Sequence, residues 1–418
     1  MKKIVCILIA LTVFTSSIFA KNRFFDSRFL ELEANIPMQI SNNYFSYGDI
    51  KTGEDLVIDL EKMADTLPAS GLESIAAAQM NTGIRLNLFG CSIGAFVGLD
   101  LTGKVNIGKD LFDFLGKGYS VGEEAVFDMD LDMDVFLTSK VPVSLDIRRL
   151  QVCIEPTLFV PLVNMSVVDA RAVAQNTNDG LISVNGSALL NVYSIADYTT
   201  LYSKETGFCS SEISNVISDS VNGKYFGFDL GGSFNYRLSD MLMITSGFQI
   251  PIVPGTLSYS TAIKGSFEYE TTLMDAMQGN NPDGLKKEFS VGEVEKVERK
   301  IHRPLKFNIG AQVCPFCDDW FTVNMMAGVG IKHPFSKISG DIEVFPEYKL
   351  GANISLASIL KANLMTACID QSFIQQAGFG VSIRFIELNA GVSTQGVSFY
   401  DSLRGRGLGA YVTINVGI

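Results

Sequence analysis

The sequence predicts an all-β protein: a transmembrane antiparallel β-barrel of about fourteen strands, preceded by a short N-terminal helical or plug segment. Three observations predict this class. The last strand alternates strictly, the apolar content is high without long apolar runs, and many alternating segments follow one another with short turns between them.

The C-terminal segment 407–418 alternates between apolar residues and residues that are polar or small. A period of two is the repeat of a β-strand, whose successive side chains point to opposite faces. One apolar face over about ten residues is typical of a strand that crosses a bilayer in a barrel. The segment therefore predicts lipid on one side and a polar lumen on the other.

Composition supports the same class. The chain is 47% hydrophobic and 19% charged, with a mean hydropathy of +0.23. After residue 20 it has no uninterrupted apolar stretch near the ~18 residues that a membrane helix needs. The formal net charge is −12, and no polybasic segment is present, so no nucleic-acid partner is expected.

Residues 1–20 have the pattern of a secretory signal peptide. Lys2 and Lys3 precede an apolar run over 4–13, and small residues lead to a predicted cleavage after Ala20. Export through the periplasm to the cell outer membrane follows from this segment and the last strand together.

The remaining strands form a predicted meander without a Pro/Ser-rich linker, so residues 81–418 are expected to be one barrel. A hairpin over 82–88 and 92–102 opens it. Further strands are predicted at 127–135, 150–162, 224–236, 241–252, 256–270, 304–314, 319–331, 341–355, 359–369, 376–386, 388–396 and 407–418, with less regular candidates at 28–41 and 180–193.

Other segments lack strand periodicity. Helical spacing over 53–66 and an Ala-rich stretch over 71–79 predict a short helical element, so 21–80 is expected to be an extended and helical segment that plugs the lumen. Polar stretches predict long outward loops near 165–222 and 275–303, the second with some helix.

The most distinctive polar group comprises four aspartates at alternate positions: Asp128, Asp130, Asp132 and Asp134. Charge facing lipid is costly, so these side chains are expected in the lumen or beyond the membrane rim. An EF-hand is excluded because Met133 and Ser139 replace its Gly and Glu. Two interpretations stay open, a pore-lining or cation-binding site and simple solvated carboxylates.

Catalytic motifs are matched only superficially. Residues 90–94 fit G-x-S-x-G around Ser92, but a nucleophile elbow needs a strand-turn-helix context and both flanks alternate as strands. Only His302 and His333 could supply an imidazole base. No enzyme activity and no cofactor are expected.

Cys314 and Cys317 match C-x-x-C within a predicted hairpin turn. A redox motif of this kind normally opens a helix, and a zinc site would need a second pair of ligands. A local disulfide in a periplasmic turn is therefore favoured, and no metal site is predicted.

These features together resemble a known family. The signal peptide, an extended segment with Asn42-Asn43, about fourteen strands and the amphipathic last strand look like outer-membrane barrels related to the long-chain fatty-acid transporter FadL. Residues 159–162 and the turn 315–320 are similar to spirochaete barrel proteins. The Asn-Pro-Ala segment of that family is absent, and Ile418 stands where outer-membrane barrels usually end in Phe.

The resemblance implies passive transport of small hydrophobic or amphipathic molecules, a lumen plugged by the N-terminal segment, and recognition of 407–418 by the outer-membrane assembly machinery. Two other functions stay open: a surface-exposed structural or adhesin barrel whose long loops bind a partner, and a cation-preferring porin. A secreted β-sandwich is the remaining alternative, since alternating strands build those too.

Overall fold

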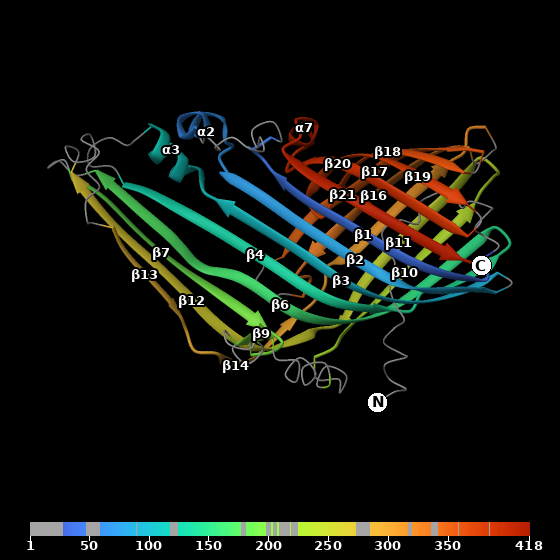
Figure 1. The fold of residues 1–418 in the computed structure, drawn as a ribbon, viewed down its shortest axis with the longest axis horizontal. Helices are drawn as coiled ribbons and strands as arrows, with labels where there is room; N and C mark the ends of the chain where they lie inside the picture. Colours follow the sequence, from blue (N-terminus) through green and yellow to red (C-terminus); the bar gives the residue numbers. More distant parts are fainter. Residues whose placement is uncertain are drawn as a thin grey trace.

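The computed structural model describes residues 28–46, 59–88, 90–117, 124–176, 181–197, 202–203, 207–208, 218, 225–272, 285–316, 320–335, 342–357, 359–383 and 385–418. The strands form a closed antiparallel barrel of 14 strands (Figure 1). In ring order the strands are β1 (Leu30–Asn42), β2 (Leu72–Leu88), β3 (Cys91–Ile107), β4 (Glu124–Lys140), β6 (Leu150–Asn176), β10 (Gly227–Arg237), β11 (Leu242–Val253), β15 (Leu305–Val313), β16 (Phe321–Lys332), β17 (Glu343–Leu356), β18 (Leu360–Ile369), β19 (Ser372–Ile383), β20 (Ile386–Gly396) and β21 (Gly407–Gly417).

The ring closes at β1, which pairs with β2 on one side and with the C-terminal β21 on the other. Ile36, for example, lies opposite Val412 of β21. A short strand, β5 (Val143–Ile147), follows β4 and pairs with β3 and β6 at the rim. Every strand of the ring is therefore hydrogen-bonded to a neighbour on each side. A sheet that spans a membrane requires this, because lipid cannot satisfy unpaired backbone groups.

Part of the wall extends beyond the ring. β6 is 27 residues long; its first part pairs with β10 and its second part with β7 (Leu181–Ser194). β7 pairs with β12 (Gly255–Thr272), whose other edge carries β13 (Leu285–Val291) and β14 (Glu295–Ile301). We call this open sheet, residues 163–176, 181–194, 255–272, 285–291 and 295–301, the overhang; it projects to the left in Figure 1.

The two ends of the barrel differ. The C-terminus lies at an end with tight turns, such as the β2–β3 turn, where Gly90 has a φ of +86° that suits glycine. The other end carries α2 (Leu60–Thr66), α3 (Lys109–Lys117) and α7 (Phe399–Leu403) (Figure 1). α2 packs on α3 through a buried cluster of Met63, Leu67 and Phe112. The two-residue strands β8 (Tyr202–Ser203) and β9 (Gly207–Phe208) pair separately.

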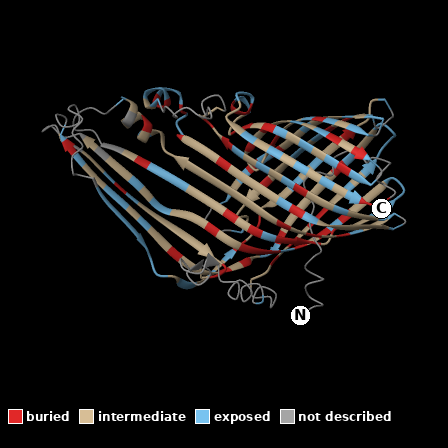
Figure 2. Ribbon diagram, in the orientation of Figure 1, coloured by how far each residue is buried: buried red, intermediate tan, exposed pale blue. Residues whose placement is uncertain are grey.

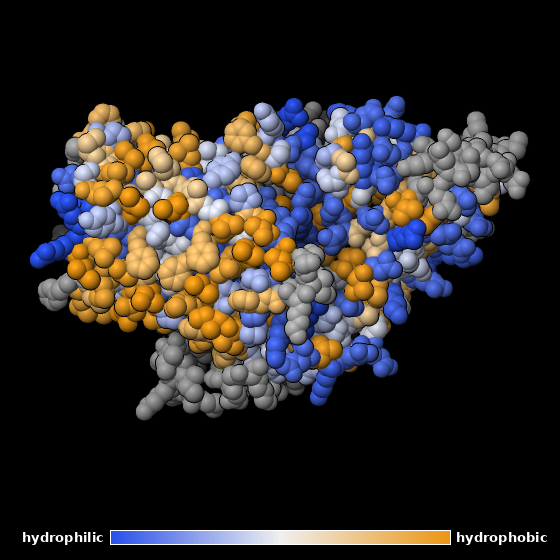
Figure 3. Space-filling model, turned by 180° about the vertical axis from the view of Figure 1, so that it is seen from behind, coloured by the Kyte–Doolittle hydropathy of each residue, from blue (hydrophilic) through white to orange (hydrophobic). Residues whose placement is uncertain are grey.

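The outer face of the barrel is apolar. Along β21, Val412 and Ile414 are 39% and 41% exposed, and they alternate with polar residues on the lumen side. Figure 2 shows the alternation of burial along the strands, and Figure 3 shows apolar side chains gathered over the barrel end of the molecule. No described helix is both long and apolar enough to cross a membrane.

The predicted all-β barrel is confirmed, but several segment boundaries were wrong. Residues 30–42 and 72–80 are wall strands, so they do not belong to a plug over 21–80. The Ala-rich stretch 71–79 opens β2 instead of a helix. Alanine favours helices, but strand pairing with β1 on one side and β3 on the other overrides this local preference.

Two predicted loops also contain strands. Residues 165–176 continue β6, and 285–301 form β13 and β14. Their charges suggested loops, but strands at the edge of a sheet carry charged side chains without penalty. The signal peptide and the other parts of the predicted plug and loops, including 1–27, 47–58, 177–180 and 273–284, lie outside the described residues and stay predictions.

Candidate functional site

The candidate site is the lumen, and strand alternation decides which side chains reach it. In β4 the even-numbered residues Asp134, Phe136 and Thr138 are buried, whereas Leu137 is 39% exposed on the outer face. The same parity holds for the aspartates predicted to line a pore. Their strand assignment within 127–135 is correct.

The structure divides the four aspartates into two pairs. Asp132 and Asp134 lie within the lumen, and Asp134 is 4% exposed. The Asn164 amide Nδ2 donates to Asp134 Oδ1 over 2.8 Å. Asp128 and Asp130 are exposed, toward the end of the barrel that carries the helices. No described group of three or more His, Cys, Asp or Glu residues is arranged to hold a metal ion.

A lysine from the opposite wall occupies the space between the two lumen aspartates. Lys332 at the end of β16 pairs with Asp132, and its Nζ lies 3.6 Å from Asp134 Oδ2. This side chain is 19% exposed. Lys332 therefore neutralises part of the negative charge of Asp132 and Asp134. This lysine was not predicted from the sequence as their partner.

Arg303, between β14 and β15, organises a second group. Its guanidinium donates to Asp100 of β3 over 2.8 Å and to Asp229 of β10 over 3.1 Å. The Asp229 side chain is 1% exposed and the Arg303 side chain 10%. Because one cation satisfies two carboxylates from separate strands, this group ties together three parts of the wall.

Lys306 of β15 forms a third group with two carboxylates. Its Nζ lies 2.8 Å from Glu347 Oε1 in β17 and 2.6 Å from Asp370 Oδ1 in the β18–β19 turn. The lysine also lies over the Phe345 ring, 5.7 Å from its centroid. That ring occupies the space a Cβ would need at Gly330, 2.3 Å away, so glycine is required there.

Other lumen ion pairs stay on one wall. Lys140 Nζ lies 3.8 Å from Glu155 Oε1, on adjacent strands, and both side chains are at most 5% exposed. Lys361 of β18 pairs with Glu387 of β20. Both pairs join residues that are close along the chain, and Lys361 and Glu387 are 26 residues apart.

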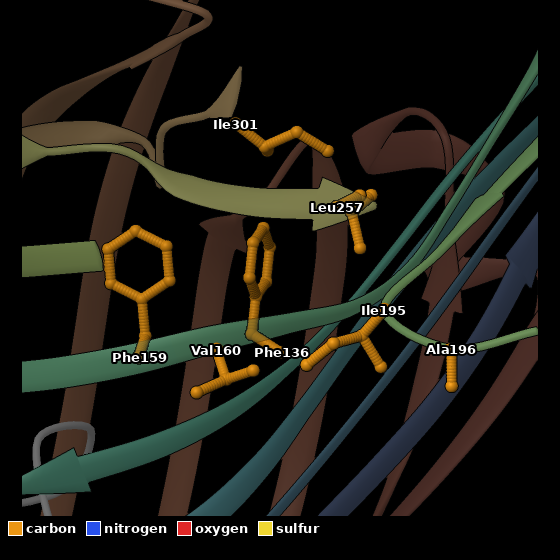
Figure 4. Close-up of a cluster of buried hydrophobic side chains, with 7 residues drawn as sticks. All are labelled: Phe136, Phe159, Val160, Ile195, Ala196, Leu257 and Ile301. Carbon is orange, nitrogen blue, oxygen red and sulfur yellow. The ribbon is translucent and has the colours of Figure 1, made fainter. Parts of the chain in front are cut away.

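An apolar cluster lies where β6 exchanges its partner β10 for β7. Phe136 and Phe159 contact each other edge to face, with centroids 5.7 Å apart (Figure 4). Around them are buried apolar residues of several elements: Val160, Ile195, Ala196, Leu257 and Ile301. Arg303 lies over the Phe159 ring at 5.9 Å, so apolar and charged groups meet here.

The remaining motifs fall outside this site. Ser92 lies in β3 at a tight turn, and the flank after it is strand, not helix, as the sequence predicted. Cys317 is outside the described residues, so its disulfide with Cys314 stays a prediction.

Comparisons give only distant similarities. No protein-family profile and no curated protein sequence matches the chain. Among solved structures it is similar to the Pseudomonas putida toluene transporter TodX, at 7% identity and a TM-score of 0.48, over 96% of this chain and 94% of that one. It is also similar to the Ralstonia pickettii toluene transporter TbuX, at 6% identity, a TM-score of 0.43 and coverages of 94% and 90%. The CymD monoaromatic hydrocarbon channel gives 8% identity, a TM-score of 0.44 and coverages of 98% and 94%.

Proposed function

We propose that this chain is an outer-membrane barrel that passes small hydrophobic or amphipathic molecules by binding and diffusion, without chemistry. The apolar cluster around Phe136 and Phe159 carries the proposal. These rings come from the lumen-facing positions of β4 and β6, and they lie beside the Arg303 group. The rings are buried, at 6% exposure for Phe136 and 0% for Phe159, so an apolar permeant would reach them by displacing the side chains that cover them. A wide aqueous pore would instead leave its lining side chains in contact with water.

The closed ring and its apolar outer face support the location in a bilayer. We also propose that the strand 407–418 is the segment read by the outer-membrane assembly machinery. Its apolar positions face outward along the whole of β21, so they are accessible on the side from which a partner would approach.

The direct test is uptake into liposomes that contain the purified protein, with toluene and oleic acid as the two probes. Replacing Phe136→Ala should reduce uptake several-fold. The matched control is Phe307→Ala, whose ring is 44% exposed on the outer face. Equal uptake by protein-containing and empty liposomes would reject the proposal. Migration of unboiled and boiled samples on a denaturing gel confirms that each variant folds.

A cation-preferring pore is the second candidate, favoured by Asp132 and Asp134 within the lumen. Lys332 already neutralises part of their charge, so any preference should be modest until that lysine is removed. Reversal potentials in a KCl gradient measure it, and the preference should fall when both aspartates are changed to Asn.

A further inference from the structure

Two hairpins on opposite walls present matched charges to each other. In β3–β4, Lys104 is the register partner of Asp132; in β16–β17, Lys332 is the register partner of Glu343. At this register each hairpin therefore places one lysine and one carboxylate side by side, and Asp134 lies two residues farther along β4. In ring order β3 and β17 are diametrically opposed, since equal numbers of strands separate them in both directions.

The contacts between these hairpins run crosswise. Lys104 Nζ lies 3.6 Å from Glu343 Oε1, and Lys332 pairs with Asp132. Each lysine thus reaches across the lumen to the carboxylate of the other hairpin. We call Lys104, Asp132, Lys332 and Glu343 the charge quartet.

Neighbouring groups hold the quartet in place without removing it from water. Lys104 also contacts Glu73 at 3.1 Å and donates to Gln371 over 3.2 Å. The side chains of Lys104 and Glu343 are 31% and 42% exposed. Partly solvated pairs of this kind are weaker than buried ones, so they can separate and re-form.

We propose that the charge quartet is a latch that closes the lumen, and that the barrel conducts when the quartet side chains of the β3–β4 and β16–β17 hairpins separate while the wall stays paired. Among the described residues, ion pairs join the two hairpins at this level. The paired and separated arrangements of these side chains form two states, and the quartet biases the lumen toward the closed one. The latch requires a membrane-spanning barrel, but it does not depend on which molecule the barrel passes.

Charge swaps within one hairpin test the latch while they keep the net charge constant. The double substitution Lys332→Glu with Glu343→Lys preserves the attractive pair inside its own hairpin. It makes both cross-lumen contacts repulsive, because glutamate then faces Asp132 and lysine faces Lys104. The double substitution Lys104→Glu with Asp132→Lys does the same from the other wall. In planar bilayers each should raise the open probability for K⁺ and Cl⁻ about tenfold.

Combining all four substitutions restores both cross-lumen attractions and should return the open probability most of the way to wild type. The matched control is Lys286→Glu, which breaks the exposed pair with Glu268 outside the lumen and should leave the open probability unchanged. The latch is refuted if either double variant behaves as wild type, or if the fourfold variant stays as open as the doubles.

The wild-type protein offers a second test that needs no variant to fold. Salt screens partly exposed pairs, so open probability should rise as KCl increases from about 0.1 M to 1 M. An open probability that does not change with salt also refutes the latch. Because this readout is ion current, a barrel that fails to take up toluene or oleic acid can still pass or fail it.

Discussion

The ring and the overhang are built from equally regular strands, yet their edges and faces differ. In the ring every strand has two neighbours, and β1 and β21 join its ends. In the overhang, the pairing described for β13 and β14 is with β12, and both strands carry lysines and glutamates at exposed positions. Closure allows apolar residues along the whole outer face, whereas an open edge needs charge to avoid pairing with other chains.

The comparison explains why similar alternation has different consequences. Ile414 on β21 and Phe289 on β13 are both exposed apolar residues, at 41% and 74%. The first belongs to a continuous apolar belt around a closed ring. The second lies on a sheet edge among charged residues. The same substitution should therefore give opposite results in the two regions.

The largest effect is expected from charge on the belt. Ile414→Lys should cost about 2–4 kcal/mol of stability in the bilayer and abolish assembly, because lysine would face lipid on a strand that closes the ring. Phe289→Lys in the overhang should assemble normally. Heat-modifiability of the outer-membrane fraction measures both, and equal assembly of the two variants would contradict the assignment of the belt.

A loss of stability that still permits assembly is expected when a lumen cation is removed. Arg303→Met should destabilise the barrel by about 3 kcal/mol, since Asp100 and Asp229 would lose their shared counter-ion in a largely buried site. Lys286→Met breaks an exposed pair with Glu268 in the overhang, where the lysine side chain is 73% exposed, and should leave the unfolding midpoint unchanged. Unfolding in urea with detergent present gives both midpoints. An Arg303→Met variant as stable as the wild type would contradict a stabilising role for the Arg303, Asp100 and Asp229 group.

The smallest difference concerns two glycines. A Cβ at Gly378 of β19 would lie 2.0 Å from the Tyr411 hydroxyl oxygen, so Gly378→Ala should cost about 1–3 kcal/mol. Nothing lies within 4 Å of a Cβ at Gly265 of β12 in the overhang, and Gly265→Ala should be neutral or stabilising by up to about 1 kcal/mol. Unfolding midpoints of the two variants should move in opposite directions or differ clearly; identical shifts would mean that Tyr411 simply rotates away.

The strands could be predicted from the sequence because the alternation of apolar and polar side chains with a period of two is visible within a few consecutive residues. Alternation located most of the ring and put the four aspartates of 128–134 on one face, in the lumen or beyond the membrane rim; the structure then places Asp132 and Asp134 in the lumen. It failed where the local signal was ambiguous. The alanines of β2 fit either period, and the charges of β13 and β14 suggested a loop although backbone pairing with β12 makes them strands.

The partners in the lumen could not be found in the same way. Lys332 lies 200 residues from Asp132, and Arg303 lies 203 from Asp100. No periodic pattern links such positions, because which walls face each other depends on the number of strands and on the closure of the ring.

The sequence by itself determined that this chain forms alternating strands with an apolar and a polar face, since side-chain direction and solvent preference act residue by residue. Only the tertiary structure decided that residues 30–42 close the ring, that β7 and β12–β14 leave it as an overhang, and that Lys104 and Lys332 cross the lumen to opposite carboxylates. These features depend on strand pairing and on the curvature of the whole sheet, which bring distant residues within the few ångströms over which ion pairs form.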